Sequence, residues 1–340
     1  MLQFQFESST TYQGKKMAQI DIGTKAEQVA DLSSKVKAQS VIVPNRKIVV
    51  NGRLDVDVWW QAAEEIEFKN NGELVFTSAA SEKRSELFVV CRKITVVSGV
   101  GRITWQKTAP PAPADRGQAA NGVNGQGEGG HGGAGADGQT GAIGRTGTDA
   151  PDFTIFLQTL ANTGNLEIDF SGASGGVGGL GQTGGTGGNG ERGAAARQGR
   201  TNVFGATVWQ PWCESGPGQG GNGGPGGRGG DGGIGGLGGR GGTITICADP
   251  ARIPVLRQAI QIRNDGGTGG EGGAPGSGGA GGNGGSEGQL ANFCNSAGRN
   301  GSPGVAGAAA QKGAKGTPGT QGAQFDANLT DDQWEKLFKA

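Results

Sequence analysis

Two patterns of hydrophobic and polar positions divide this chain of 340 residues. From residue 41 to residue 105, apolar and polar residues alternate in short stretches, such as ELFVVCRKITVV and GRITW, that end at Asn, Gly or Ser. Alternation with a period of two is typical of half-buried β-strands. The sequence therefore predicts an all-β N-terminal module over residues 41–106.

Two arrangements of these strands remain open. Strands stacked in parallel as the rungs of a β-solenoid would offer the last rung as a base for the rest of the chain. In contrast, Asn71-Gly72 lies between the apolar stretches IEF and LVF, and this dipeptide is a strong signal for an antiparallel hairpin. The module is expected to be either β-solenoid-like or small and antiparallel.

Beyond residue 117 a period of three replaces the period of two. Gly occupies every third position in five runs, with one lapse at Ala310: residues 129–147, 172–193, 218–242, 267–288 and 298–322. Three residues per turn is the period of an extended polyproline II helix, which makes no internal hydrogen bonds. Neighbouring helices can satisfy one another's N–H and C=O groups, and glycine faces let the backbones approach closely. The sequence predicts a bundle of about five polyglycine II helices over residues 117–323.

The segments between the glycine runs have a different character. Residues 152–176 and 242–267 share one layout, in which a β-rich stretch, a break and a second alternating stretch lead into a glycine run. We expect these segments to be β-strand connectors between the helices of the bundle. KTAPPAPA, within residues 107–116, is a stiff Pro-rich boundary between the two parts of the chain.

Composition separates this interpretation from its competitors. The chain has 74 Gly but 13 Pro, whereas collagen needs Gly once per triplet and a Pro-rich remainder; residues 301–322 alone look collagen-like. Disordered linkers are the other alternative, although a linker has no reason to keep a phase. Gly125, Gly127 and Gly130 fit G-x-G-x-x-G, but no strand leads into them. Lys+Arg and Asp+Glu balance at 30 each, so there is no basic field for nucleic acid.

Both ends of the chain carry apolar stripes. Within an N-terminal arm of residues 1–40, the stretch LQFQF alternates like a strand without a partner in its neighbourhood. Within residues 324–340, Thr330 and Gln333 form a capping box that predicts a short amphipathic α-helix. A strand without a partner and a helix too short to stand alone are candidates for self-association. The candidate assembly residues are Leu2, Phe4, Phe6, Trp334, Leu337 and Phe338.

The connector over residues 194–217 carries an apolar cluster. Val208, Trp209 and Trp212 are expected to pack as a cap on the end of the bundle, and they are also candidate contacts for a receptor or glycan at its tip. If successive helices run antiparallel, Cys213 and Cys294 lie at the same end of the bundle, so the sequence predicts a disulfide between them.

Catalytic chemistry is sparse. The four cysteines lack the paired spacing of a zinc site, and the single histidine, His131, lies inside a glycine run as an outward residue. No Ser, His and Asp constellation or pair of acids stands out. We therefore expect a protein that is not an enzyme and has no catalytic, cofactor or metal residues.

The expected location is extracellular, on a cell surface or in a virion. No apolar run approaches the roughly 18 residues of a membrane span. The N-terminal sequence MLQFQFESSTTYQGKK lacks the basic-then-apolar order of a signal peptide.

The GG-X runs, especially residues 172–193 and 218–242, resemble those of the polyglycine II repeat proteins. This class includes the glycine-rich adhesins at phage tail-fibre tips and the snow-flea antifreeze protein. The resemblance covers about the last two thirds of the chain and lies in period and composition, so it implies an architecture more firmly than an activity. An antifreeze would present a flat row of small residues, whereas the third column of residues 219–240 mixes Arg, Asp, Gln, Ile and Leu.

The function expected from these observations is that of a non-enzymatic structural protein, a subunit of a self-assembling extracellular fibre. The first alternative is a receptor-binding adhesin at a fibre tip. An ice-binding protein and a hydrolase built on a β-solenoid are minor alternatives.

Overall fold

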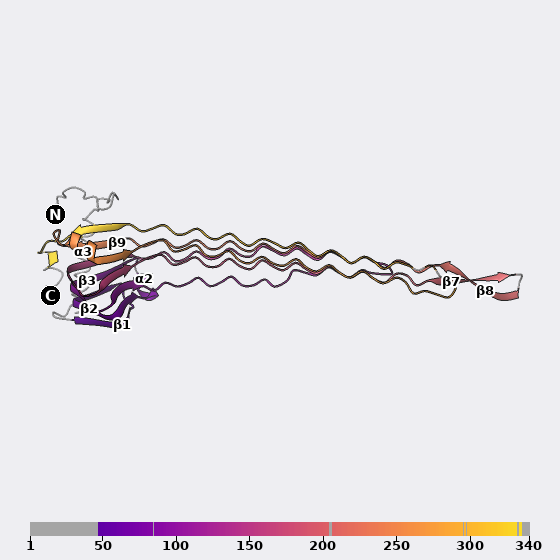
Figure 1. The fold of residues 1–340 in the computed structure, drawn as a ribbon, viewed down its shortest axis with the longest axis horizontal. Coiled ribbons are helices and arrows are strands. Elements are labelled where there is room, and N and C mark those ends of the chain that lie inside the picture. Colours follow the sequence, from indigo (N-terminus) through magenta and orange to yellow (C-terminus); the bar gives the residue numbers. More distant parts are fainter. Residues whose placement is uncertain are drawn as a thin grey trace.

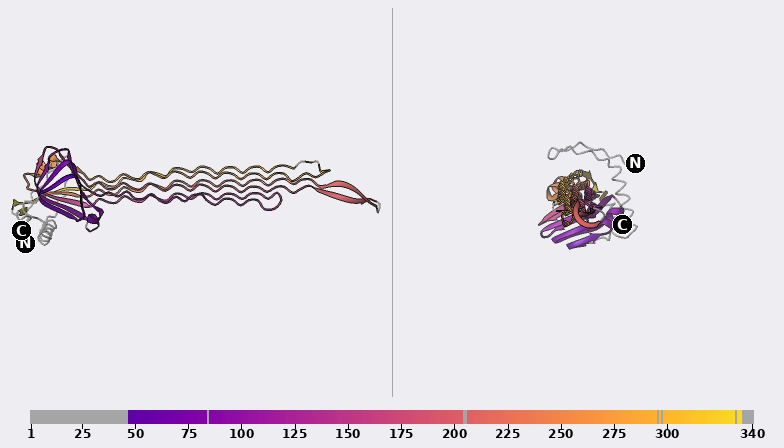
Figure 2. Two further views of the ribbon diagram at one scale, coloured as in Figure 1. Left: turned by 90° about the horizontal axis from the view of Figure 1, so that it is seen from below. Right: turned by 90° about the vertical axis from the view of Figure 1, so that its right-hand side faces the viewer.

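The computed structural model of the protein combines a β-sheet head with a long glycine-rich shaft that ends in a β-hairpin (Figures 1 and 2). The structure describes residues 47–83, 85–203, 206–294, 296, 298–331 and 333–334. The head occupies one end of the long axis, and the hairpin occupies the opposite end (Figure 1).

In the described part of the chain, the head is built on one parallel sheet of nine strands, ordered β10-β6-β4-β2-β3-β5-β9-β11 with β1 paired to β2. Among the described residues, two short helices, α2 and α3, accompany the sheet. The strands are β1 (Lys47–Val56), β2 (Trp60–Phe76), β3 (Glu86–Val96), β4 (Val100–Trp105), β5 (Asp152–Asn162), β6 (Asn165–Asp169), β9 (Ile244–Ala248), β10 (Ile260–Arg263) and β11 (Gln324–Asn328), and the helices are α2 (Ser78–Lys83) and α3 (Ile253–Ala259).

The sheet folds back on itself along a row of corners. Within β2 the corner is at Asn70 and Asn71, whose φ angles are 50° and 58°; the part of β2 before it pairs with β3, and the part after it pairs with β4. Such positive φ angles are tolerated by asparagine more readily than by most residues. Asn70 Nδ2 donates to Asn51 Oδ1 at 3.2 Å, and the Asn70 N–H donates to Ser98 Oγ at 3.2 Å. Polar side chains therefore join successive corners.

The hydrophobic core lies between the two halves of the folded sheet. Phe153 of β5 stacks on Phe170, which follows β6, with 4.4 Å between ring centroids, and Phe76 of β2 lies 6.2 Å from Phe153. The inward residues of the alternating strands, such as Ile66 and Ile168, are fully buried. Since each buried side chain of this size contributes about 1.5–3 kcal/mol, this core is the main source of stability in the head.

The shaft consists of six extended segments, which we call A to F. Segments A, C and E leave the head after β4, β6 and β10, and segments B, D and F return to β5, β9 and β11 (Figure 1). The hairpin of β7 (Arg197–Val203) and β8 (Ala206–Ser215) joins C to D at the far end. The segments are A (107–126), B (130–151), C (170–196), D (216–243), E (264–289) and F (298–323).

Backbone hydrogen bonds at three-residue intervals join these segments into two layers. Along D, the N–H of Gly232 donates to Gln311 of F at 2.8 Å, and the N–H of Gly233 donates to Gly179 of C at 2.9 Å. Residue numbers rise together within the pairs A–C, C–E, B–D and D–F, and in opposite directions between the two sets. The outgoing segments thus form one layer and the returning segments form the other.

Each layer continues one half of the sheet with unchanged register. Phe156 of β5 pairs with Cys247 of β9, 91 residues later, and Asp149 of B bonds Arg240 of D, also 91 residues later. The offset is 94 residues for β6–β10 and for C–E, 80 for β9–β11 and for D–F, and 65 for β4–β6 and for A–C. Head and shaft are therefore one continuous hydrogen-bonded structure.

Polar side chains in the shaft accept hydrogen bonds from backbone N–H groups that do not donate to a neighbouring backbone. Asp137 Oδ1 accepts the N–H of Arg228 at 2.7 Å, and Asn189 Oδ1 accepts the N–H of Asn283 at 2.8 Å. His131 does the same through Nδ1, which lies 2.8 Å from the Asn222 nitrogen. This side chain thus has a structural role in the shaft, in which its ring nitrogen acts as an acceptor.

Glycine is required at positions where the backbone of a neighbouring segment occupies the place of a side chain. A Cβ placed on Gly233 would overlap the carbonyl oxygen of Ala142, and one on Gly307 would overlap that of Gly227. The single lapse in the glycine columns has a visible consequence: within the described part of F, the N–H groups of residues 301, 304, 307, 313, 316, 319 and 322 donate to E, but that of Ala310 does not.

The predicted fold class is wrong. Residues 41–106 do not form a separate β module, because β5, β6, β9, β10 and β11 complete the same parallel sheet. The antiparallel alternative fails because every pairing of the described head strands is parallel, and Asn71 turns a corner instead of closing a hairpin. A separate bundle of about five polyglycine II helices is replaced by six segments that extend a curled sheet. Alternation identifies a strand, but it does not identify a partner 65 to 94 residues away.

The predicted C-terminal helix also needs correction. Residues 324–328 form β11 and are not part of a helix. Residues 331, 333 and 334 are helical, and the rest of the predicted helix, residues 335–340, lies outside the described residues. The capping box is present, since the N–H of Thr330 donates to Gln333 Oε1 at 2.8 Å.

Candidate binding tip

The hairpin of β7 and β8 forms the end of the molecule that lies farthest from the head (Figures 1 and 2). Its strands pair antiparallel, from Arg197 opposite Ser215 to Val203 opposite Ala206. Two-stranded hairpins are marginally stable in water unless something else holds them. The hairpin therefore depends on its attachment to the shaft.

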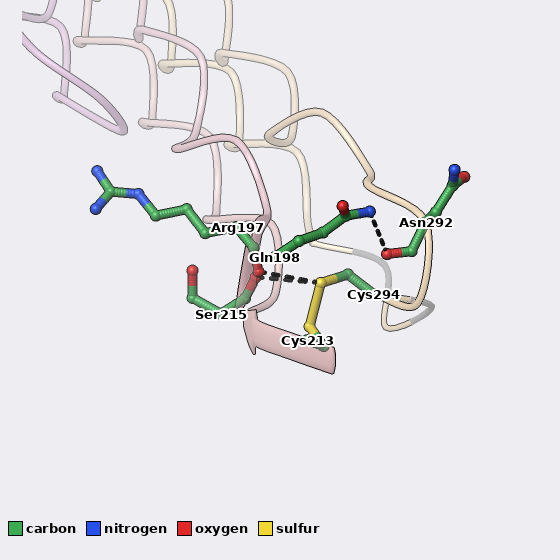
Figure 3. Close-up of a disulfide and its surroundings, with 6 residues drawn as sticks. All are labelled: Arg197, Gln198, Cys213, Ser215, Asn292 and Cys294. Carbon is green, nitrogen blue, oxygen red and sulfur yellow. Dashed lines mark hydrogen bonds between the residues drawn. A yellow bond between two sulfur atoms is a disulfide. The ribbon is translucent and has the colours of Figure 1, made fainter. Parts of the chain in front are cut away.

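A disulfide supplies that attachment. Cys213 of β8 is bonded to Cys294, in the turn between E and F, with 5.0 Å between their Cα atoms (Figure 3). This is the pairing that the sequence predicts. Gln198 Nε2 donates to the Asn292 carbonyl at 2.7 Å, beside the disulfide (Figure 3). The base of the hairpin is thus fastened to the E–F turn at two points.

The remaining two cysteines are far from the tip in the fold. Cys91 and Cys247 are buried in the strands of the head. Burial raises the pKa of the Cys91 thiol to about 12. A thiol with this pKa stays protonated at neutral pH, and thiolate chemistry is not expected there.

Exposed apolar side chains flank the disulfide. Trp212 precedes Cys213 and is 49% exposed, and Phe293 precedes Cys294 and is 60% exposed. Leu290, in the same E–F turn, is 58% exposed. Phe293 has a φ of 70°, a conformation that is unfavourable for a bulky residue and that persists where surrounding contacts impose it. The fold therefore holds two aromatic rings at the surface of its far end.

Trp212 lies over the backbone of the opposite strand. Gly199 is its cross-strand partner, and a Cβ on Gly199 would lie 2.6 Å from the indole Nε1 and 2.7 Å from Cζ2. Gly199 is buried for this reason, although its neighbour Gln198 is exposed. The glycine thus makes room for the indole ring against the hairpin.

A shallow cavity lies on the shaft near the tip, beside the turn between A and B. It measures about 290 Å³, and its lining includes Gly127, Glu128, Glu191, Arg192 and Gln289. The Arg192 side chain donates from Nε to the Glu287 carbonyl at 3.1 Å. The charged groups of this cavity are exposed, so it lacks the enclosed, largely apolar character of a typical small-molecule site.

The other candidate residues have different surroundings. Val208 and Trp209 belong to β8. Trp334 is buried against the outer face of the head, in a cluster with Trp60, Phe88 and Leu329, so its side chain serves the fold of its own chain. The remaining assembly candidates lie outside the described residues: Leu2, Phe4, Phe6, Leu337 and Phe338.

Sequence reasoning missed Phe293 and Gly199. Phe293 directly precedes Cys294, one of the cysteines predicted to pair. This position could have indicated that Phe293 lies near the disulfide. Gly199 carries no signal of its own in a chain so rich in glycine. Its role depends on the register between β7 and β8.

No protein-family model matches the chain, and no curated protein sequence matches it. A search of solved structures finds similarity to the nine-helix polyproline type II bundle of a springtail antifreeze protein from Granisotoma rainieri, at 24% identity over 57% of this chain and 93% of that one. The TM-score of 0.08 is too low to support any statement about fold or function.

None of the described helices combines the length and the hydrophobicity needed to cross a bilayer. Groups of three or more His, Cys, Asp or Glu side chains arranged to hold a metal ion are also absent from the described part of the chain.

Proposed function

We propose that the protein is a non-enzymatic, rod-shaped adhesin that acts outside the cell and binds a surface receptor through its tip. The observation that carries this proposal is the disulfide-fastened pair of exposed aromatic residues, Trp212 and Phe293, at the end opposite the head. Exposed aromatic side chains on a rigid support are typical of recognition surfaces.

The shaft supports this proposal by keeping the tip away from the head. Segment D has 28 residues, so at about 3.1 Å per residue the shaft spans roughly 85 Å. Because each segment is hydrogen-bonded to its neighbours along its length, the shaft is a stiff spacer. A spacer of this kind is useful where an anchored protein must reach a target surface.

The disulfide supports a location outside the cytoplasm. Disulfides persist in oxidising compartments and on cell or virion surfaces, and they are rare in the cytosol. The bond between Cys213 and Cys294 links parts of the chain that are 81 residues apart in sequence.

The experiment that tests the adhesin is a cell-binding assay. Labelled full-length protein is incubated with a panel of intact bacterial and animal cells, beside a variant in which a Gly-Gly link replaces residues 198–212. We expect the parent to bind some members of the panel and the variant to bind none, with the circular dichroism of the head unchanged. The matched control is Val305→Ser, an exposed position on the shaft, which should bind like the parent. Binding that survives loss of the hairpin would overturn the proposal.

A fibre subunit is the second candidate, and one observation favours it. Among the described strands β1 pairs with β2 alone, so one edge of the sheet carries backbone groups that can accept another strand. The predicted donor is the N-terminal stretch with Leu2, Phe4 and Phe6, which lies outside the described residues. Addition of this strand to the next subunit would be head-to-tail, which produces a filament when the rotation does not close.

Deletion of residues 1–8 tests the fibre. In the case of strand exchange, the truncated protein stays folded but is monomeric by light scattering, and the peptide MLQFQFES binds to it. A parent protein that is already monomeric, or a truncated protein that fails to fold, would exclude this candidate.

A further inference from the structure

We infer that Trp212 is a stacking platform for a pyranose ring, so that the tip recognises a surface saccharide. This inference rests on the adhesin function proposed above and names its ligand class.

The indole ring of Trp212 packs against the hairpin and remains exposed enough to bind a flat ligand. The indole covers the Cα of Gly199, whose missing side chain makes this close approach possible. The ring is nevertheless 49% exposed, and the neighbouring Cys213 is tied to the E–F turn. A ring held in this way loses little conformational freedom when it binds. The C–H groups on one face of a pyranose match the negative face of an aromatic ring.

The size of the hairpin favours a small ligand over a protein surface. β7 has seven residues, so one face of the two-stranded ribbon measures about 23 Å by 10 Å, or roughly 230 Å². Each partner in a stable protein complex buries about 800 Å². One sugar residue needs an area of the size of the indole ring, whereas a folded protein partner needs several times the area of the hairpin face.

Polar groups near the platform can bind sugar hydroxyls. Arg197 of β7 is exposed, and its guanidinium carries five N–H donors. Gln198 pairs with Cys213 and donates to Asn292, so it lies on the face of the hairpin away from the indole. Hydrogen bonds from Arg197 would orient a sugar whose ring lies on Trp212.

Phe293 is a second exposed aromatic residue near the platform. Consecutive Cα atoms are about 3.8 Å apart, and those of Cys213 and Cys294 are 5.0 Å apart. The Cα atoms of Trp212 and Phe293 are therefore at most about 13 Å apart. Stacking on one or two rings is weak by itself, and several adhesins acting on one surface would add avidity.

The test uses cells to which the full-length parent binds. One sample is treated with metaperiodate, which oxidises the vicinal diols of sugars, and another is treated with a protease. We expect metaperiodate to abolish binding and the protease to leave it. Trp212→Ala should weaken binding about tenfold or more, and Trp212→Phe should keep most of it, because a ring remains. Leu290→Ala is the matched control, an exposed apolar residue in the neighbouring turn, and it should bind like the parent.

Mass spectrometry of each variant must show the disulfide between Cys213 and Cys294, so that lost binding is not lost structure. Binding that is abolished by the protease and survives metaperiodate would overturn the saccharide and leave the adhesin standing, with a protein receptor. Full binding by Trp212→Ala would overturn the role of the platform. Failure of the parent to bind any cell would instead overturn the adhesin function itself.

Discussion

At the scale of the residue, the glycines of the shaft contact neighbouring segments, and the residues between them carry the exposed side chains. In segment D, Gly232 and Gly233 donate to two different neighbouring segments, while the next residue, Ile234, is half exposed. Each glycine is needed because another backbone occupies the place of its side chain. Adjacent positions in the same segment should therefore respond very differently to substitution.

Gly233→Ala should destabilise the shaft strongly. The new Cβ overlaps the Ala142 carbonyl and disturbs the hydrogen bond to Gly179. Overpacking and one lost hydrogen bond together cost about 2–4 kcal/mol. The measurement is urea unfolding followed by circular dichroism. The matched control is Ile234→Ala, where a surface change is expected to stay within about 0.5 kcal/mol. Equal effects of the two changes would show that the segments are not packed as described.

The polar side chains between the glycines also have defined tasks. Asp137→Ala removes the acceptor for the N–H of Arg228, so it should cost roughly 0.5–1.5 kcal/mol. Asp137→Asn keeps an oxygen acceptor at the same place and should cost clearly less. Urea unfolding of the two variants separates the hydrogen bond from the charge. A full loss in Asp137→Asn would mean that the charge, and not the acceptor, matters.

At the scale of the element, the outgoing segments of the shaft begin after strands of the head, and side chains at these junctions hold neighbouring segments together. Asp169, the last residue of β6, accepts the N–H of Ser171 at 3.0 Å and pairs with the Lys107 ammonium at 3.0 Å. Lys107 begins segment A, and Ser171 belongs to segment C. This carboxylate therefore holds the starts of two neighbouring segments. Burial raises its pKa, but the bonds from Ser171 and Lys107 outweigh that effect, and the net pKa of Asp169 is lowered.

The lowered pKa of Asp169 gives a prediction for acid stability. A carboxyl whose pKa is lower in the folded than in the unfolded state stabilises the fold fully above the unfolded pKa. That contribution disappears as the pH falls below about 4 and through the folded pKa. We expect Asp169→Asn to be less stable than the parent at pH 7, by about 1 kcal/mol, and the difference to shrink as the pH falls from 4 to 2. Urea midpoints across this range measure it, and a constant difference would contradict the assignment.

At the scale of the whole molecule, the repeated offsets make head and shaft one object. The offset of 91 residues that pairs β5 with β9 also pairs B with D. Hydrogen bonds of 2.7–3.0 Å join the segments across the layers and along them. No hinge is expected where the sheet gives way to the shaft.

Small-angle X-ray scattering should therefore show a rod. A compact protein of this length would have a radius of gyration of about 20 Å. A rod with a shaft of roughly 85 Å, a head and a hairpin reaches about 140 Å, and its radius of gyration is roughly 40 Å. A measured value near 20 Å would contradict the extended shaft. The measurement is made in monomeric samples, so that association does not lengthen the particle.

The sequence by itself determined the local features. Alternation marked the strands over residues 41–106 and the strand-like stretches between the glycine runs, and the phase of glycine marked the ordered shaft. The cysteine positions, combined with an antiparallel succession of the glycine runs, predicted the pairing of Cys213 with Cys294. The strands, the shaft and the disulfide follow from periodicity or from the order of residues along the chain, and both can be determined without knowing which segments are in contact.

Tertiary structure alone decided which segments become neighbours. Strands such as β5 and β9 join one sheet although 81 residues lie between them, and the cap on the Arg228 N–H comes from Asp137, 91 residues earlier. Trp212 covers Gly199 because of the hairpin register. Because nearly every residue offers the same backbone N–H and C=O groups, backbone hydrogen bonding alone does not distinguish one pairing register of two segments from another. The packing of the head core and the close approach of glycine backbones select one register.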